Sequence, residues 1–119
     1  MARVSDLSME ITRALRTYTS EVTEGLEEAK EEVAKNASKK LRRTSPRDTG
    51  KYARGWRAKK VGRAWVVHNS TRYQLTHLLE HGHAKRGGGR VPGIPHIRPV
   101  EQQAITEFQQ RVEGVIRGR

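Results

Sequence analysis

Apolar residues recur every three or four positions along the first third of the chain. The stripe runs from Val4 to Leu41 and predicts one long helix over residues 5–42, which Pro46 would end. Such a helix would be about 55 Å long, whereas a compact domain of this chain length is only about 35 Å across. We therefore expect the helix either to bend near Gly25 or to project with one end beyond its own domain.

After a loop at residues 43–50, the pattern changes to one that favours extended structure. Residues 51–61 and 64–69 are predicted strands, and Gly62-Arg63 forms a tight turn that joins them into a β-hairpin. Tyr52, Trp56 and Ala58 lie broadly on one predicted face, with basic residues largely on the other. We interpret Trp56 and Trp65 as core residues, although aromatic rings beside Arg and Lys can also stack on bases.

The last part of the chain alternates short elements with one further amphipathic segment. Residues 73–81 predict a short helix that ends at Gly82, and residues 96–98 are a candidate third strand. Pro99 suits the first turn of a closing helix that ends near Gly118. The fold class predicted is α+β, in a single domain over residues 1–119. It comprises a long N-terminal helix, a small antiparallel sheet of about three strands, a short helix and a C-terminal helix.

The amino-acid composition limits the size of the core and the kinds of site that the chain can form. Hydrophobic residues make up 34% of the chain, so the core of one molecule must be small, which favours burial against partner subunits. There is no cysteine, which excludes disulfides and thiolate zinc sites. The sequence has neither a long apolar run nor a signal-peptide pattern, so we expect no membrane span and a protein made and used in a cytoplasm.

The net charge of +11 is concentrated in one region. Residues 43–98 carry thirteen basic side chains against Asp48 and Glu80, whereas residues 1–42 and 99–119 are each neutral. Such a region attracts polyanions or an acidic protein surface, unless it is simply a solvated face.

The first helix gathers six glutamates within residues 21–32, several of them four positions apart. Like charges at this spacing repel one another. Because the sequence keeps these glutamates despite their repulsion, they suggest a basic partner surface, such as the middle of a neighbouring copy. An ordinary solvated helix face is the alternative.

Neither the histidines nor the glycines form a known catalytic pattern. His77, His81, His83 and His96 lack the HExxH order, and we expect them to bond to the backbone rather than to a metal. The run Gly87-Gly88-Gly89-Arg90 lacks the phosphate-loop pattern, and neither a cysteine nor a GxSxG nucleophile is present. We predict no enzyme activity, no cofactor and no metal.

The densest feature is Leu78–Pro99, with five glycines and three prolines, which predicts a shaped, irregular path. Together with DTGKYARGW at Asp48–Trp56, a strand ending at Asn69, and Tyr73, this stretch resembles the tail-component family of lambdoid siphophages. Members are also described as head–tail connector, neck or tail-completion proteins. The resemblance covers roughly residues 45–117 and extends from the hairpin through HLLEHGHAKRGGGRVPGIPHIRP at His77–Pro99.

The resemblance implies a structural protein of the virion or of a prophage, made in the bacterial host cytoplasm. It would join connector, head-completion and tail proteins where DNA passes from head to tail, and form a ring there. The implied hairpin residues are Thr49, Gly50, Tyr52, Gly55 and Trp56. The short helix and its stop are assigned to Leu78, Leu79, Glu80, Gly82 and His83. The implied assembly loop comprises Glu80, Gly82, His83, Gly88, Arg90, Pro92, Pro95, His96 and Pro99.

DNA in the passage would face basic side chains of the middle region. The candidates are Arg54, Arg57, Lys59, Lys60, Arg63, Lys85, Arg86 and Arg90. The alternative function is a small, sequence-indifferent DNA-binding protein that acts through residues 43–98. Salt-dependent affinity for random duplex DNA separates these two hypotheses. A metal-dependent enzyme at the histidines is a third and weaker one.

Overall fold

One helix, α1 (Val4–Thr44), runs along most of the molecule. The structure is a computed structural model that describes residues 4–47 and 50–118. At 41 residues α1 is about 61 Å long, within a molecule that measures 86 × 21 × 20 Å. It continues through Gly25 without interruption, and every side chain from residue 8 to residue 20 is exposed. Of the two expected arrangements, the structure therefore has the projecting end and not the bend.

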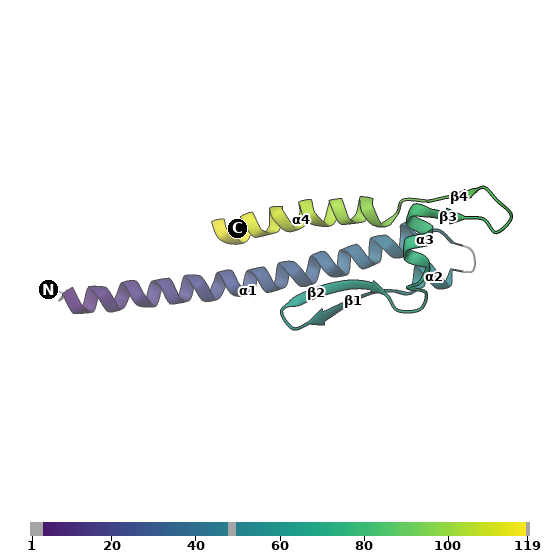
Figure 1. The fold of residues 1–119 in the computed structure, drawn as a ribbon. Coiled ribbons are helices and arrows are strands. Elements are labelled where there is room, and N and C mark those ends of the chain that lie inside the picture. The colour runs from purple at the N-terminus through teal and green to yellow at the C-terminus, as the bar shows by residue number, and fades with distance from the viewer. Residues whose placement is uncertain (1–3, 48–49, 119) are drawn as a thin grey trace.

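The second long helix, α4 (Ile97–Arg117), lies antiparallel to α1 along its C-terminal half (Figure 1). The two helices approach most closely at Gly25, where an added Cβ would lie 2.7 Å from a methyl carbon of Val115. Near the end of α4, the Tyr18 hydroxyl donates a hydrogen bond to the carbonyl of Ile116, at 3.2 Å. Gly25 thus serves helix packing, which explains why it sits inside a helix that it otherwise weakens.

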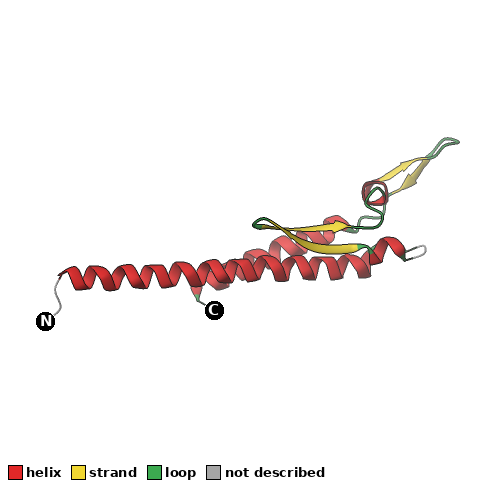
Figure 2. Ribbon diagram, turned by 90° about the horizontal axis from the view of Figure 1, so that it is seen from below, coloured by secondary structure: helices red, strands yellow, loops and turns green. Residues whose placement is uncertain are grey.

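A β-hairpin packs across the C-terminal half of α1 (Figure 2). Its strands are β1 (Trp56–Val61) and β2 (Ala64–Asn69), paired with Trp56 opposite Asn69 and Lys60 opposite Trp65. The strand predicted to begin at Lys51 starts only at Trp56, because Lys51–Arg54 form a short helix, α2. This turn of helix buries Tyr52 and Ala53 against α1, a position that tertiary packing decides and local pattern does not reveal.

The end of the molecule opposite the N-terminus consists of α3 (Leu75–His81) and a second hairpin, β3 (Gly82–Ala84) with β4 (Arg90–Pro92). The expectation of an irregular path was wrong here, because the glycine run forms the turn of a regular hairpin. The third strand expected at residues 96–98 was also wrong. Its residues cap and begin α4.

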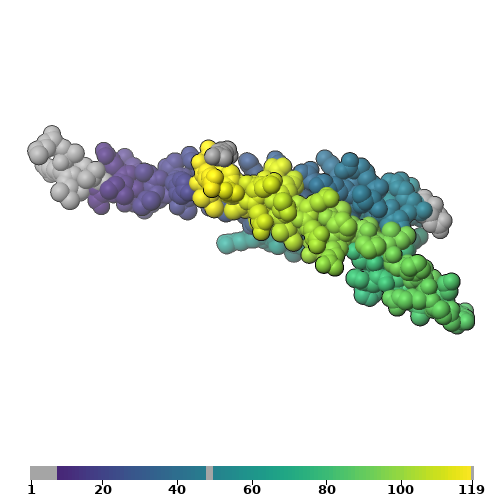
Figure 3. Space-filling view, turned by 90° about the horizontal axis from the view of Figure 1, so that it is seen from above, coloured from purple at the N-terminus to yellow at the C-terminus, as the bar shows by residue number. Residues whose placement is uncertain are grey.

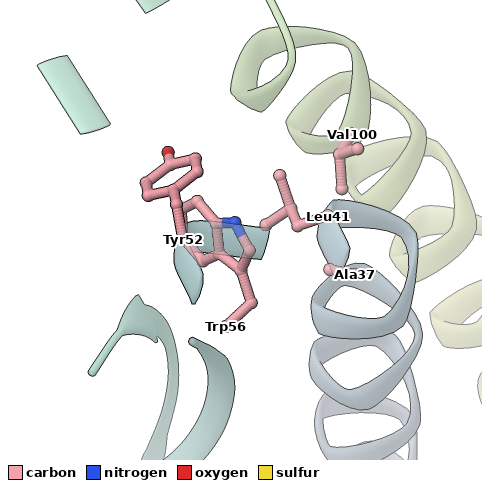
Figure 4. Close-up of a cluster of buried hydrophobic side chains, with 5 residues drawn as sticks. All are labelled: Ala37, Leu41, Tyr52, Trp56 and Val100. Atoms are coloured by element: carbon pink, nitrogen blue, oxygen red, sulfur yellow. The ribbon is translucent and has the colours of Figure 1, made fainter. Parts of the chain in front are cut away.

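The core lies where α1, α2, β1 and α4 meet (Figure 4). Its central cluster of buried residues comprises Ala37, Leu41, Tyr52, Trp56 and Val100. The Trp56 indole nitrogen donates to the Ser45 hydroxyl at 2.8 Å, so its one polar atom is satisfied inside the core. The expected core role is confirmed for Trp56 but was wrong for Trp65, which is only partly buried. The core is small, as the composition predicted.

Across residues 4–47 and 50–118, we find no helix with the length and apolar character that crossing a membrane requires.

Candidate functional site

The joint between α3 and α4 is built around the carboxylate of Glu80. Its Oε1 accepts hydrogen bonds from the backbone N–H groups of His96 and Ile97, at 2.7 and 2.8 Å. Its Oε2 accepts one from the N–H of Arg98, at 3.0 Å. The next residue, Pro99, has no N–H to satisfy. A side chain of one helix therefore satisfies the free donors at the start of another, where the helix dipole also favours a negative charge.

The environment of Glu80 decides its ionisation. Burial is the strongest influence and alone would raise the pKa of the carboxyl, since only 8% of the residue is exposed. The three backbone donors, helped by His96, outweigh burial and lower the pKa below its ordinary value of 4.5. Glu80 is consequently a buried anion at neutral pH, and it holds α3 to the start of α4.

His96 ties the same joint to the core. Its Nδ1 lies 2.7 Å from the carbonyl oxygen of Ile94, and its Nε2 lies 2.7 Å from the Tyr52 hydroxyl. A carbonyl can only accept, so Nδ1 carries a proton, and the Nε2 of a neutral ring accepts from Tyr52. Burial, followed by the charge of Glu80, raises the pKa of Tyr52 to about 12, which keeps this hydroxyl protonated and able to donate. His96 is 2% exposed, and its contact with the Ile94 carbonyl supports the expected backbone-bonding role for this histidine.

Two glycines let the chain pass closely through this joint. A Cβ on Gly93 would lie 2.7 Å from the backbone nitrogen of Gly82, and Gly82 itself has a φ of 80°. The N–H of Ile94 donates to the Leu79 carbonyl at 2.7 Å, so the segment after β4 is bonded directly to α3. Backbone contact this close excludes any side chain at Gly93.

The implied assembly loop therefore divides into two groups. Glu80, Gly82 and His96 are buried and shape the joint. The remaining members are exposed: His83, Gly88, Arg90, Pro92, Pro95 and Pro99. The first group acts inside the molecule, and only the second has the exposure that contact with another protein needs.

Every candidate DNA-facing residue is exposed, and the set falls into two places. Arg54, Arg57, Lys59, Lys60 and Arg63 belong to β1 or adjoin it, whereas Lys85, Arg86 and Arg90 belong to the β3–β4 hairpin. The Lys60 ammonium lies 4.0 Å from Glu27, so this residue is turned towards α1. The basic side chains thus lie along the molecule and do not form one compact patch.

Three glutamates of α1 form ion pairs with other described residues. Glu27 binds Lys30 at 2.8 Å, Glu31 binds Lys35 at 2.6 Å, and Glu32 pairs with Arg111 of α4. Glu21, Glu28 and Glu32 line a groove of about 450 Å³ between α1 and the end of α4, beside Gly25 and Ala29.

The start of the first hairpin depends on Gly55 and Asn69, which lie close together. Gly55 is required because a Cβ there would lie 2.6 Å from the side-chain oxygen of Asn69; Thr49 lies outside the described residues. Sequence reasoning missed the role of Asn69, whose amide donates to the Tyr52 carbonyl at 2.7 Å and accepts from the N–H of Arg72 at 2.8 Å. Its position at the end of a strand was the available signal.

The rings of His77 and His81 lie side by side on α3, with centroids 4.8 Å apart. In the part of the chain that the structure describes, there is no group of three or more His, Cys, Asp or Glu side chains placed to hold a metal ion.

Comparison with known protein families identifies a bacteriophage family. A family model described as "Bacteriophage HK97-gp10, putative tail-component" matches residues 9–82, which is more than half of the chain. The match includes most of α1, both strands of the first hairpin, and α3 with Glu80. No curated protein and no solved structure matched.

Proposed function

Because this chain belongs to the HK97-gp10-like family of bacteriophage tail components, we propose that it acts at the joint between the tail and the DNA-filled head. Membership makes it a structural phage protein and a part of the virion. The finer proposal is that it completes or joins the tail by binding connector, head-completion and tail proteins, as a ring of identical copies around the DNA passage.

The observation that carries this proposal is the shape of the molecule. The molecule is an 86 Å rod whose small core lies beside Ala37 and Leu41 of α1, and both ends of the rod extend beyond this core. At one end, residues 8–20 of α1 are wholly exposed; at the other, the β3–β4 hairpin exposes residues 83–90. A chain with so little buried surface is stabilised by burial in an assembly, and rings are the usual outcome of repeated contacts around an axis.

The test uses the phage or prophage that encodes the chain. We expect deletion of the gene to leave filled heads and separate tails in electron micrographs, with infectious titre restored by supplying the wild-type chain. Leu15→Asp, on the exposed apolar face of α1, should fail to restore the titre, whereas Ser20→Asp should restore it. Ser20 is a matched control, because it is exposed on the same helix but lies about 140° around the helix axis from Leu15. Joined, infectious particles without the chain would refute the proposal.

A second candidate function rests on the exposed basic residues. All eight candidates have the exposure needed to contact phosphates, so we also propose that DNA in the passage touches some of them. A sequence-indifferent DNA-binding protein is the alternative in which this contact is the main activity.

Binding to random duplex DNA at several salt concentrations separates the two. The free tail component should bind weakly, whereas a DNA-binding protein should bind tightly, with an affinity that falls steeply as salt rises. Replacing Lys85 and Arg86 by glutamate should reduce that salt slope by about two, since each lost phosphate contact removes about one ion from it. An unchanged salt slope would show that these two residues do not contact DNA.

A further inference from the structure

Two histidines of α3 lie side by side near one end of the rod. His77 and His81 are four residues apart, so they share one face of the helix, and their ring centroids are 4.8 Å apart. Figure 3 shows the green part of the chain, which contains the second hairpin beside α3, projecting at the end of the molecule opposite the purple start of α1. Both histidines are exposed, and neither ring forms a hydrogen bond or an ion pair with another described residue. Within the described chain, their nitrogens are therefore available to a ligand.

The separation of the two rings is close to that of two imidazoles bound to one metal ion. An imidazole nitrogen lies about 2.0–2.1 Å from Zn²⁺, and two ligands of a tetrahedral ion are separated by an angle of about 109°. Each ring centroid then lies roughly 3.2 Å from the ion, so the two centroids are about 5.2 Å apart. The observed 4.8 Å approaches this value with the backbone as it stands, and a small rotation of the side chains completes the fit.

The groove beside the two rings has the charge that a cation requires. It has a volume of about 550 Å³ and lies between α3 and the first turns of α4. Besides His77 and His81, its lining includes Glu80, Glu101 and Arg98, and two carboxylates against one guanidinium favour a cation. Among the residues that the structure describes, no carboxylate is placed with the two rings as a third ligand, so water molecules would complete the coordination.

From this geometry we propose that His77 and His81 together bind one divalent ion of a late transition metal, such as Zn²⁺ or Ni²⁺. Neutral imidazole is a ligand that suits these ions, and two histidines four residues apart on a helix form a known ligand pair. For these two residues, the proposal replaces the expectation that the histidines bond to the backbone rather than to a metal.

The proposed activity is metal binding and not hydrolysis. The order His-x-x-Glu-His at residues 77–81 also occurs in zinc peptidases, and the glutamate of such helical motifs serves as a general base. Here Glu80 is buried, and its oxygens accept three hydrogen bonds from the backbone of residues 96–98. Glu80 is therefore not available as a base. The ion would instead stabilise the turn of α3 that carries Glu80, because it binds the two rings together only when this turn is helical.

Calorimetric titration of the untagged, metal-free protein with ZnCl₂ and with NiCl₂ tests the site. We expect one ion per chain. His77→Gln and His81→Gln should each weaken binding at least tenfold, because a single imidazole lacks the high effective concentration of the second. The double variant should bind only slightly more weakly than either single variant, since both rings hold the same ion. His83→Gln is the matched control, because His83 is exposed on the neighbouring strand β3, and its loss should leave the affinity unchanged.

A second measurement distinguishes a chelated ion from one held loosely at the surface. Saturating ZnCl₂ should raise the thermal midpoint and slow the hydrogen exchange of α3 amides in the wild type and in His83→Gln. Neither change should occur in His77→Gln. No binding, an unchanged affinity in either single variant, or losses that simply add in the double variant would overturn the proposal. The metal site is independent of the proposed function, so these outcomes leave the role at the head–tail joint unaffected.

Discussion

Replacing Glu80 by glutamine should destabilise the fold strongly. The carboxylate accepts three backbone hydrogen bonds at 2.7–3.0 Å while only 8% of the residue is exposed. Hydrogen bonds to a charged group each contribute about 1.5–3 kcal/mol. Glutamine keeps one acceptor oxygen, but its NH₂ group faces an N–H donor, and the favourable charge at the start of α4 is lost. Relief from burying a charge offsets part of this loss.

We therefore expect the Glu80→Gln variant to lose about 2–4 kcal/mol of unfolding free energy, a large part of the ~5–15 kcal/mol of a typical domain. Urea unfolding followed by tryptophan fluorescence measures it, because Trp56 lies in the adjoining core. Glu101→Gln is the matched control, since Glu101 is an exposed glutamate of α4, and it should change stability by less than about 0.5 kcal/mol. A Glu80→Gln variant as stable as this control would refute the capping role.

Glu80 also predicts how the stability of the protein changes with pH. The pKa of Glu80 in the folded chain lies below its ordinary value of 4.5, so its contribution is fully present above that value. It is lost as the pH falls through the lowered pKa. The difference in stability between wild type and Glu80→Gln should therefore be constant from about pH 5 to 7 and shrink only in more acidic solution. A difference that shrinks as the pH rises above neutrality would show that the assigned direction is wrong.

Two further predictions concern glycines that permit close packing. Gly93→Ala should loosen the joint between α3 and α4, because its Cβ would lie 2.7 Å from the nitrogen of Gly82. Hydrogen exchange of the backbone amides in residues 75–96 should then rise. Gly87→Ala is the control and should leave this exchange unchanged, because no described atom lies within 4 Å of a Cβ at Gly87. Gly25→Ala should lower the thermal midpoint by pressing on Val115, despite the helix propensity of alanine. The double variant with Val115→Ala should recover part of the loss, and a lack of recovery would refute direct contact at this crossing.

The periodic parts of the chain were predictable because their signals are local. The stripe along α1 and the apolar face of α4 follow helical spacing, and the first hairpin carries strand residues around Gly62. The core role of Trp56 was predicted in the same way. Two predictions failed where a distant partner decides the conformation. The segment Lys51–Arg54 is helical because Tyr52 and Ala53 fill the core, and residues 96–98 begin a helix because Glu80 caps it from sixteen or more residues away.

By itself, then, the sequence determined the fold class, the long first helix with its surplus length, the position of the net charge, and the motifs typical of a phage tail component. Tertiary structure decided which end of α1 is left uncovered and which members of the implied assembly loop face inward. It also decided that Gly25 is a packing site and that the glycine-rich stretch forms a hairpin. The physical reason is the range of the interactions. Periodicity and charge are properties of neighbouring residues, whereas Glu80 and His96 acquire their roles only when the folded chain brings α3, α2 and the start of α4 together.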